Sequence, residues 1–203
     1  ACELSAIDDG VGQIMGTLKR LGLDEDTLVI FTADQGWAGG QNGLWGMGDH
    51  TRPLHAFDST MHIPLIFRHP GPIPPARTSD IMVSNYDLLP TVLAHVGLAG
   101  EVPSRPKPPG RDYSAALQGA PPPWDNVVFY EFENVRAIRT ADWKYIHYPQ
   151  LQNMDELYDL KNDPGEITNL IDHPRYQTQL AQLKRELAQL HRETENPFPL
   201  ELD

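Results

Sequence analysis

Residues 27–36 read Thr-Leu-Val-Ile-Phe-Thr-Ala-Asp-Gln-Gly, an apolar run that leads into an acid, an amide and a glycine. The apolar run shows no alternation, which is typical of a central β-strand covered on both faces. We therefore expect a strand over 28–32 within an α/β sheet. Open α/β sheets bind ligands at the carboxyl ends of such strands. Asp34 and Gln35 follow directly, so the sequence predicts a functional site at these two residues.

The segments on either side of this strand predict a mixed α/β organisation. An apolar stripe before it recurs at steps of three and four, which predicts a helix that ends at Gly22. The stripe consists of Leu4, Ile7, Val11, Ile14, Leu18 and Leu21. A second strand is expected over 63–67, and capping residues at 84–87 precede a helix that runs from near Pro90. Residues 36–55 are rich in glycine and show no clear period, which predicts a long loop.

The second half of the chain differs in composition and in its pattern of apolar residues. Residues 99–123 carry seven prolines, which indicates a linker or an extended surface strap. Short strand patterns follow and predict an antiparallel sheet, and an apolar stripe from Tyr176 to Leu190 predicts a helix that covers it. The strand patterns lie at 127–131, 136–140, 144–148 and 156–160. We therefore expect an α/β part over 1–98, a proline-rich linker over 99–126 and a small α+β unit over 127–203.

Composition narrows the classes of partner and the setting. With 28 acidic against 16 basic residues and a net charge of −12, the chain lacks the basic balance of proteins that bind nucleic acid. An anionic substrate would require a local basic pocket. The single cysteine excludes an internal disulfide, and no apolar run reaches the length of a membrane span. Because the chain begins without methionine, inside or just before a helix, we expect a longer protein whose targeting signal would precede Ala1.

The order of the motifs resembles the sulfatase family of the alkaline-phosphatase superfamily. The similar segments include the stretch at 27–36, Gly-Leu-Trp-Gly at 43–46, His-Ile-Pro-Leu-Ile-Phe at 62–67, and Glu-Leu-Tyr-Asp-Leu-Lys-Asn-Asp-Pro-Gly-Glu at 156–166. The resemblance covers nearly the whole chain. It implies the C-terminal part of an alkaline-phosphatase-like α/β sandwich, followed by a small subdomain of antiparallel sheet and C-terminal helix.

The resemblance also implies an activity and a set of cofactors. Sulfatases hydrolyse sulfate esters with a divalent metal, usually Ca²⁺, and with a formylglycine made from Cys or Ser in their N-terminal half. The nucleophile would therefore lie outside this chain, and we expect the chain alone to be inactive. Asp34 and Gln35 match the family's second pair of metal ligands, and carboxylate and amide oxygens suit Ca²⁺. The alternative is that these residues only begin a turn. Many bacterial relatives are exported.

The loop departs from the family pattern at two positions. Relatives commonly carry a His and a Lys beside the Gly-Leu-Trp motif, and both contact the region of the sulfate or the leaving group. Here the corresponding residues are Asn42 and Met47, and Met47 supplies no charge. The next basic residues are His50, a possible general acid, and Arg52, whose planar fork can grip an anion. Asn42, His50 and Arg52 are therefore candidate substrate-binding residues, unless Arg52 simply pairs with a neighbouring acid.

Two other functions stay open at this point. The missing Lys is compatible with a phosphodiesterase or phosphonate monoester hydrolase of the same superfamily. A sulfatase-like binding protein without catalysis is the other alternative. In either enzymatic case we expect a small-molecule or carbohydrate ester as substrate, with no nucleic acid partner.

Overall fold

The computed structural model describes residues 2–48, 50–105, 108–120, 122–151, 153–194, 200 and 202. It begins with the predicted helix, α1, over Cys2–Leu21. Gly22 adopts a left-handed φ of 67°, and the N–H of Leu23 donates to the carbonyl of Leu18, 2.9 Å away. This is a glycine-centred helix end, so the predicted stop at Gly22 is confirmed. None of the described helices is long and apolar enough to span a membrane.

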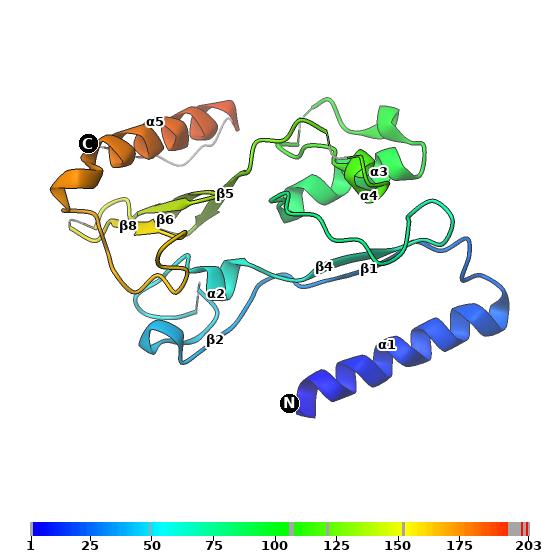
Figure 1. Ribbon diagram of the computed structural model, residues 1–203. Coiled ribbons are helices and arrows are strands. Elements are labelled where there is room, and N and C mark those ends of the chain that lie inside the picture. Colours follow the sequence, from blue (N-terminus) through cyan, green and yellow to red (C-terminus); the bar gives the residue numbers. More distant parts are fainter. Residues whose placement is uncertain are drawn as a thin grey trace.

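Both predicted strands of the first part form, but their burial differs from the expectation. β1 (Val29–Thr32) pairs antiparallel with β4 (Leu65–Arg68) in a two-stranded ribbon. The side chain of Phe31 is 37% exposed and that of Ile66 is 59% exposed. The prediction of a strand covered on both faces is therefore wrong for the described residues. The physical reason is that none of the described helices covers this face, and α1 projects away from the ribbon (Figure 1).

The predicted loop at 36–55 contains a little regular structure. Two short strands, β2 (Ala38–Gly39) and β3 (Trp45–Gly46), pair around the 3₁₀ turn η1 (Gln41–Gly43). The short helix α2 (Asp58–Met61) follows and leads into β4.

The segment after β4 carries the predicted capping chemistry. Ser84 and Asp87 form a reciprocal capping box around η2 (Asn85–Asp87), in which the N–H of Ser84 donates to the Asp87 carboxylate at 2.9 Å. The helix α3 (Leu88–His95) continues from it and confirms the prediction. A further 3₁₀ turn, η3, spans Ala99–Glu101.

The proline-rich segment follows the surface as a strap. It contains a short helix, α4 (Ser114–Leu117), which was not predicted. The guanidinium of Arg111 lies 3.9 Å from the centre of the Trp124 ring, and its backbone N–H donates to Asp87 at 2.7 Å. The indole N–H of Trp124 donates to the carbonyl of Met82 at 2.7 Å. These contacts hold the second half of the strap against the segment that precedes α3.

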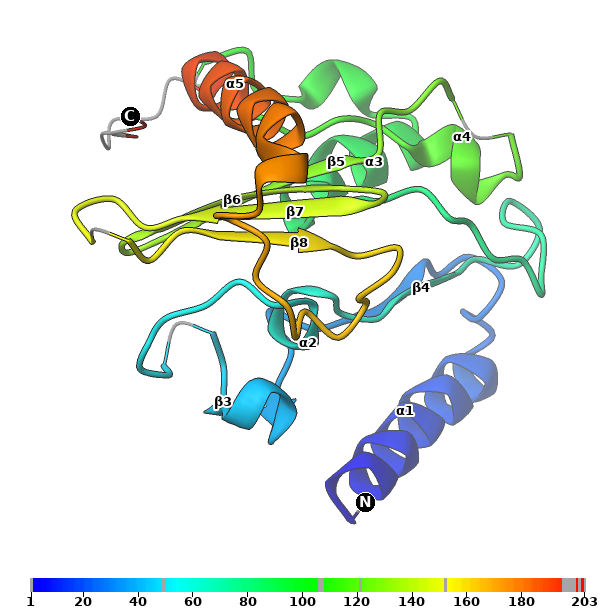
Figure 2. The same cartoon turned by 60° about the vertical axis from the view of Figure 1, so that its left-hand side comes forward.

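The predicted antiparallel sheet and its covering helix are confirmed. The strands β5 (Val127–Phe132), β6 (Val135–Thr140), β7 (Trp143–His147) and β8 (Glu156–Asp159) pair in chain order. After the 3₁₀ turn η4 (Pro174–Tyr176), helix α5 (Gln177–Glu193) lies across one face of this sheet (Figure 2). Its apolar stripe packs on the sheet through Leu180, Leu183 and Leu187, against Ile138, Tyr145 and Leu157.

The other face of the sheet packs on the segment that contains α2. Ala56 and Phe57 are buried in one core with residues of β6, β7 and β8, among them Val135, Ile146 and Tyr158. The sheet therefore rests directly on the chain that connects the loop at 36–55 to β4. This contact joins the C-terminal unit to the neighbourhood of the predicted site.

Candidate functional site

The turn after β1 is held against the backbone of α2. The N–H of Gly36 donates to the carbonyl of Thr60 at 2.8 Å. A Cβ at position 36 would lie 2.6 Å from the carbonyl oxygen of Ser59. Only glycine permits so close an approach of two backbones. The sequence Asp34-Gln35-Gly36 therefore lets the strand end directly on α2.

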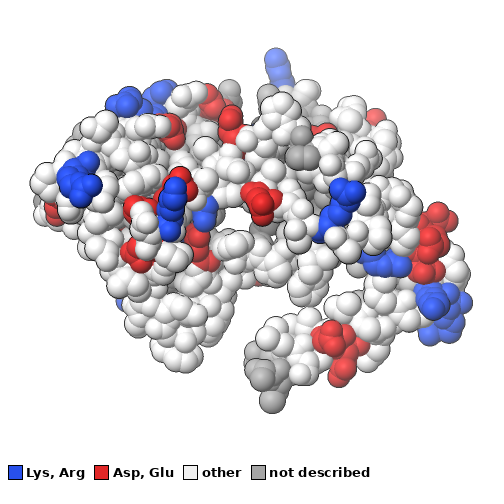
Figure 3. Space-filling view, in the orientation of Figure 1, with Lys and Arg blue, Asp and Glu red and all other residues white. Residues whose placement is uncertain are grey.

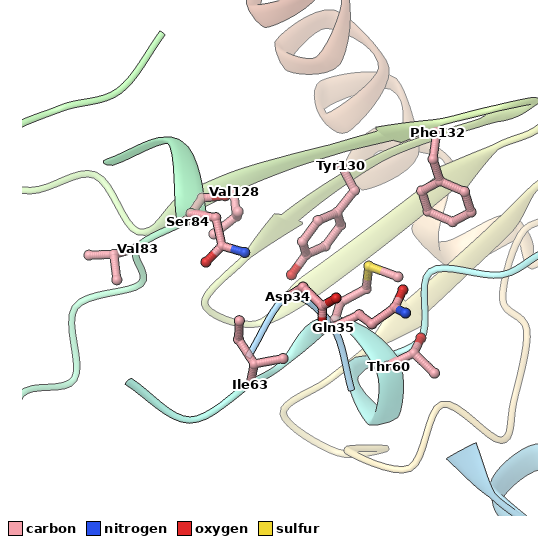
Figure 4. Close-up of a pocket in the computed structure, with 11 residues that line it drawn as sticks. Asp34, Gln35, Thr60, Ile63, Val83, Ser84, Val128, Tyr130 and Phe132 are labelled. Atoms are coloured by element: carbon pink, nitrogen blue, oxygen red, sulfur yellow. The ribbon is translucent and has the colours of Figure 1, made fainter. Parts of the chain in front are cut away.

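Asp34 and Gln35 line a cavity of about 240 Å³ between the two parts of the molecule. The space-filling view is hollowed between the C-terminal sheet and the β1–β4 ribbon (Figure 3). One wall comes from β5, whose alternate residues Val128, Tyr130 and Phe132 face the cavity (Figure 4). The lining is completed by Thr60, Met61, Ile63, Val83, Ser84 and Asn85. The turn after β1 thus opens into a chamber whose far wall is largely apolar.

The two strand-end residues offer oxygen donors to a cation. The Asp34 side chain is exposed, and the amide nitrogen of Gln35 donates to the sulfur of Met47. Because that contact occupies the amide nitrogen, the carbonyl oxygen of Gln35 is the atom that can bind a cation. Within the described part of the chain, no three His, Cys, Asp or Glu side chains gather closely enough to hold a metal ion. The donor chemistry fits a divalent metal, but two residues fall short of a Ca²⁺ shell of six to eight oxygens.

The three candidate substrate-binding residues lie outside the lining of this cavity. Asn42 is at a left-handed φ of 54°, and its amide nitrogen donates to the backbone carbonyls of Gly165 at 3.2 Å and Glu166 at 2.8 Å. His50 and Arg52 are exposed, and Arg52 donates to the carbonyl of Thr51 at 2.7 Å. The structure thus brings Asp34 and Gln35 together at one cavity and leaves the loop residues beside it.

A buried ion cluster next to α2 was missed by the sequence analysis. Lys144 on β7 is fully buried, and its ammonium lies 2.5 Å from Asp58 and 2.7 Å from Glu166. Burial raises the pKa of Asp58, but the charges and hydrogen bonds of Lys144 and Arg139 outweigh it and hold that pKa below its ordinary value. Burial also raises the pKa of Glu166, and Lys144 opposes that effect only in part.

The same lysine influences a neighbouring histidine. His55 is buried against Phe57, and burial lowers the pKa of its imidazole, with the positive charge of Lys144 as the second cause. The signal in the sequence was a lysine within the apolar pattern Trp-Lys-Tyr-Ile-His, at a position that shares a face with Ile146. A lysine at such a position requires buried acidic partners, but the sequence does not say which acids they are.

A family model and several known proteins that resemble this chain all carry sulfatase names. Residues 45–193 match the family model described as N-sulphoglucosamine sulphohydrolase, C-terminal. The chain is 29% identical over 95% of its length to an N-acetylglucosamine-6-O-sulfatase of Bacteroides thetaiotaomicron, covering 34% of that protein. It is 32% identical over 83% of its length to human arylsulfatase A, covering 38% of it.

Solved structures show the same fold. A structure solved in complex with the protein's substrate D-glucosamine-2-N,6-O-disulfate superposes with a TM-score of 0.85 at 26% identity, over 98% of this chain and 41% of that one. The phosphonate monoester hydrolase of Agrobacterium radiobacter superposes with a TM-score of 0.78 at 26% identity, over 94% of this chain and 40% of that one.

These matches agree with the fold predicted from the motif order. The chain spans about a third to two fifths of the length of the relatives it matches. The aligned region includes the α/β elements, the small antiparallel sheet and its C-terminal helix, as in an alkaline-phosphatase-like architecture. The chain belongs to the sulfatase family of the alkaline-phosphatase superfamily and corresponds to its C-terminal portion.

Proposed function

We propose that this chain is the C-terminal part of a longer protein that hydrolyses a sulfate ester with the help of a divalent metal. The observation that carries this proposal is the Asp34-Gln35 pair, which ends a strand and lines a cavity in a chain of the sulfatase family. We further propose the division into an α/β part over 1–98, a strap over 99–126 and an α+β unit over 127–203.

In this proposal Asp34 and Gln35 supply part of the metal shell, most simply for Ca²⁺. Asp34 contributes a charged oxygen and Gln35 a neutral one, and the contact of its amide nitrogen with Met47 supports that orientation. The remaining ligands and the formylglycine nucleophile would come from the segment that precedes this chain. A bound divalent metal would polarise an ester oxygen as a Lewis acid.

The loop residues have separate proposed roles. Arg52 is exposed, and its guanidinium has the planar donor geometry that suits a sulfate group, so we assign it to anion binding. His50, exposed two residues earlier, is placed as the proton donor to the leaving group. Asn42 uses its amide nitrogen within the protein, which leaves its carbonyl oxygen to accept a hydrogen bond from a substrate hydroxyl.

The substrate class is proposed from the relatives. One of them is an N-acetylglucosamine-6-O-sulfatase, and one neighbour was solved with a sulfated glucosamine. A carbohydrate or other small-molecule sulfate ester is therefore the proposed substrate. A phosphonate monoester is the second candidate, because a hydrolase of that class superposes well and Met47 replaces the lysine that sulfatases commonly carry.

The test compares the two ester classes on the complete protein. With Ca²⁺ supplied, 4-nitrophenyl sulfate, glucosamine-6-sulfate and a 4-nitrophenyl phosphonate monoester are assayed side by side. A higher kcat/KM for the sulfates supports the proposal, and a higher value for the phosphonate favours the second candidate. Ca²⁺ binding without turnover of any ester would support a non-catalytic binding protein and refute both.

A further inference from the structure

The cluster around Lys144 is tightly partnered and fully enclosed at its centre. The ammonium donates to the carbonyl of Ala56 at 2.9 Å as well as to Asp58 at 2.5 Å, and it pairs with Glu166 at 2.7 Å. Glu166 is 3% exposed. A buried ammonium without partners would be strongly unfavourable, so this lysine requires both carboxylates in place.

The cluster joins the C-terminal unit to the first residue of α2. Glu166 accepts a hydrogen bond from the backbone N–H of Asp58 at 2.6 Å, and Arg139 on β6 donates to the Asp58 carboxylate at 3.0 Å. No side chain of the α2 segment itself caps this helix. Three side chains of the C-terminal unit, Arg139, Lys144 and Glu166, therefore hold the first residue of α2 in place.

From α2 the contact continues to the strand-end pair. The carbonyl of Thr60 accepts the N–H of Gly36 at 2.8 Å, and the backbone at Ser59 leaves no room for a Cβ at position 36. The turn that carries Asp34 and Gln35 thus rests on the backbone of α2 without an intervening side chain. A shift of α2 would move this turn.

The turn at 163–166 contacts the loop as well. Its backbone carbonyls at Gly165 and Glu166 accept both hydrogen bonds of the Asn42 amide. The turn is braced internally, because the Asp163 carboxylate accepts the N–H groups of Ile167 at 2.9 Å and Thr168 at 2.8 Å. One rigid turn of the C-terminal unit therefore touches both α2 and the loop at 36–55.

We propose that Asp58, Lys144 and Glu166 are positioning residues that set the geometry of the Asp34-Gln35 pair through α2. This inference rests on the proposed function, because it takes Asp34 and Gln35 as metal ligands. In this inference the C-terminal unit does more than pack against α2, because its buried charges fix the place where the cation is bound. None of the three residues touches the cation or the substrate.

The test measures Ca²⁺ binding by calorimetry in the complete protein, with thermal unfolding in a chelator as a separate readout. Asp58→Asn and Glu166→Gln keep the size of each side chain and one oxygen acceptor, so they are preferred over removal of Lys144. Both variants are expected to weaken Ca²⁺ binding about tenfold, the lower end of the effect of losing a group that orients metal ligands. High Ca²⁺ should restore part of the turnover of 4-nitrophenyl sulfate, by mass action.

Asp155→Asn is the matched control. Asp155 is a partly buried carboxylate of the same unit that accepts hydrogen bonds from Tyr145, His147 and the backbone N–H of Tyr148, away from α2. It should lower the unfolding temperature and leave the Ca²⁺ affinity unchanged. If Asp58→Asn and Glu166→Gln lower the unfolding temperature but bind Ca²⁺ like wild type, the inference is refuted and the proposed function stands. If the wild-type protein binds no Ca²⁺, both are refuted.

Discussion

Glu156 offers a pH-dependent test of the packing between the sheet and the loop. Its carboxylate lies between the hydroxyls of Tyr148 at 3.4 Å and Tyr158 at 3.1 Å. Burial raises the pKa of Glu156 from 4.5 to about 7, the two tyrosine hydrogen bonds oppose this, and Glu166 adds to it. The Tyr148 hydroxyl also lies 3.1 Å from the carbonyl of Leu54. A protonated Glu156 can donate to Tyr148 while Tyr148 donates to Leu54, which satisfies all these groups.

The sign and size of the effect follow from linkage. The folded state binds the Glu156 proton more tightly than the unfolded state, so the free energy of unfolding falls as pH rises from 4.5 to about 7 and then levels off. At about 1.4 kcal/mol for each pKa unit, the full loss is roughly 3 kcal/mol, an upper bound for a partly exposed group. Glu156→Gln should match wild type near pH 4.5 and exceed it in stability at pH 8.

The assay is thermal unfolding of wild type and Glu156→Gln from pH 4.5 to 8. The expected result is a difference in unfolding temperature that grows with pH in favour of the variant, by a few degrees at pH 8. The control is Glu193→Gln, which removes a carboxylate from an exposed position on α5 and leaves the contacts of Glu156 unchanged. A difference between wild type and Glu156→Gln that stays constant across this range would show that Glu156 does not bind its proton more tightly in the folded state.

Three further predictions concern the candidate site in the complete protein. Asp34→Asn removes one charge from the proposed ligand set, so Ca²⁺ affinity and turnover should both fall, and excess Ca²⁺ should partly restore turnover. A Ca²⁺ affinity equal to that of wild type, measured by calorimetry, would contradict the metal assignment. Arg52→Ala should lower turnover of an aryl sulfate strongly and barely change the unfolding temperature, whereas a loss of stability with intact kinetics would indicate a structural ion pair. Gly36→Ala should destabilise the protein by about 1–3 kcal/mol in denaturant titrations, because its Cβ would meet Ser59, and an unchanged midpoint would show that the turn can move away from α2.

Local patterns predicted most of the elements. The stripes of α1 and α5 and the short strands of the C-terminal sheet form close to the predicted positions, because periodicity and turn residues are properties of neighbouring residues. The same holds for the cap at Ser84 and Asp87. The prediction of a site at Asp34 and Gln35 came from the rule that ligands bind at strand ends in α/β sheets, and it stays a prediction.

What the sequence did not predict depends on contacts between distant residues. Lys144 pairs with Asp58, 86 positions earlier in the chain, and no local pattern links them. The burial of β1 was overestimated for a related reason. An apolar strand sequence predicts burial of both faces, but the burial has to come from other segments of the protein. None of the described segments buries Phe31 and Ile66.

Glu166 combines a strained backbone conformation with a buried ion pair to Lys144. Its φ of 54° is a conformation that suits glycine or asparagine, and a longer side chain there costs roughly 1–2 kcal/mol. Removing one partner of a buried ion pair typically costs about 3–5 kcal/mol. Glycine at this position would relieve the strained backbone conformation, but it would leave Lys144 without one of its two carboxylate partners. The strain at Glu166 thus costs less than the loss of its ion pair with Lys144 would, so the backbone conformation of this turn is set by a lysine 22 residues earlier in the chain.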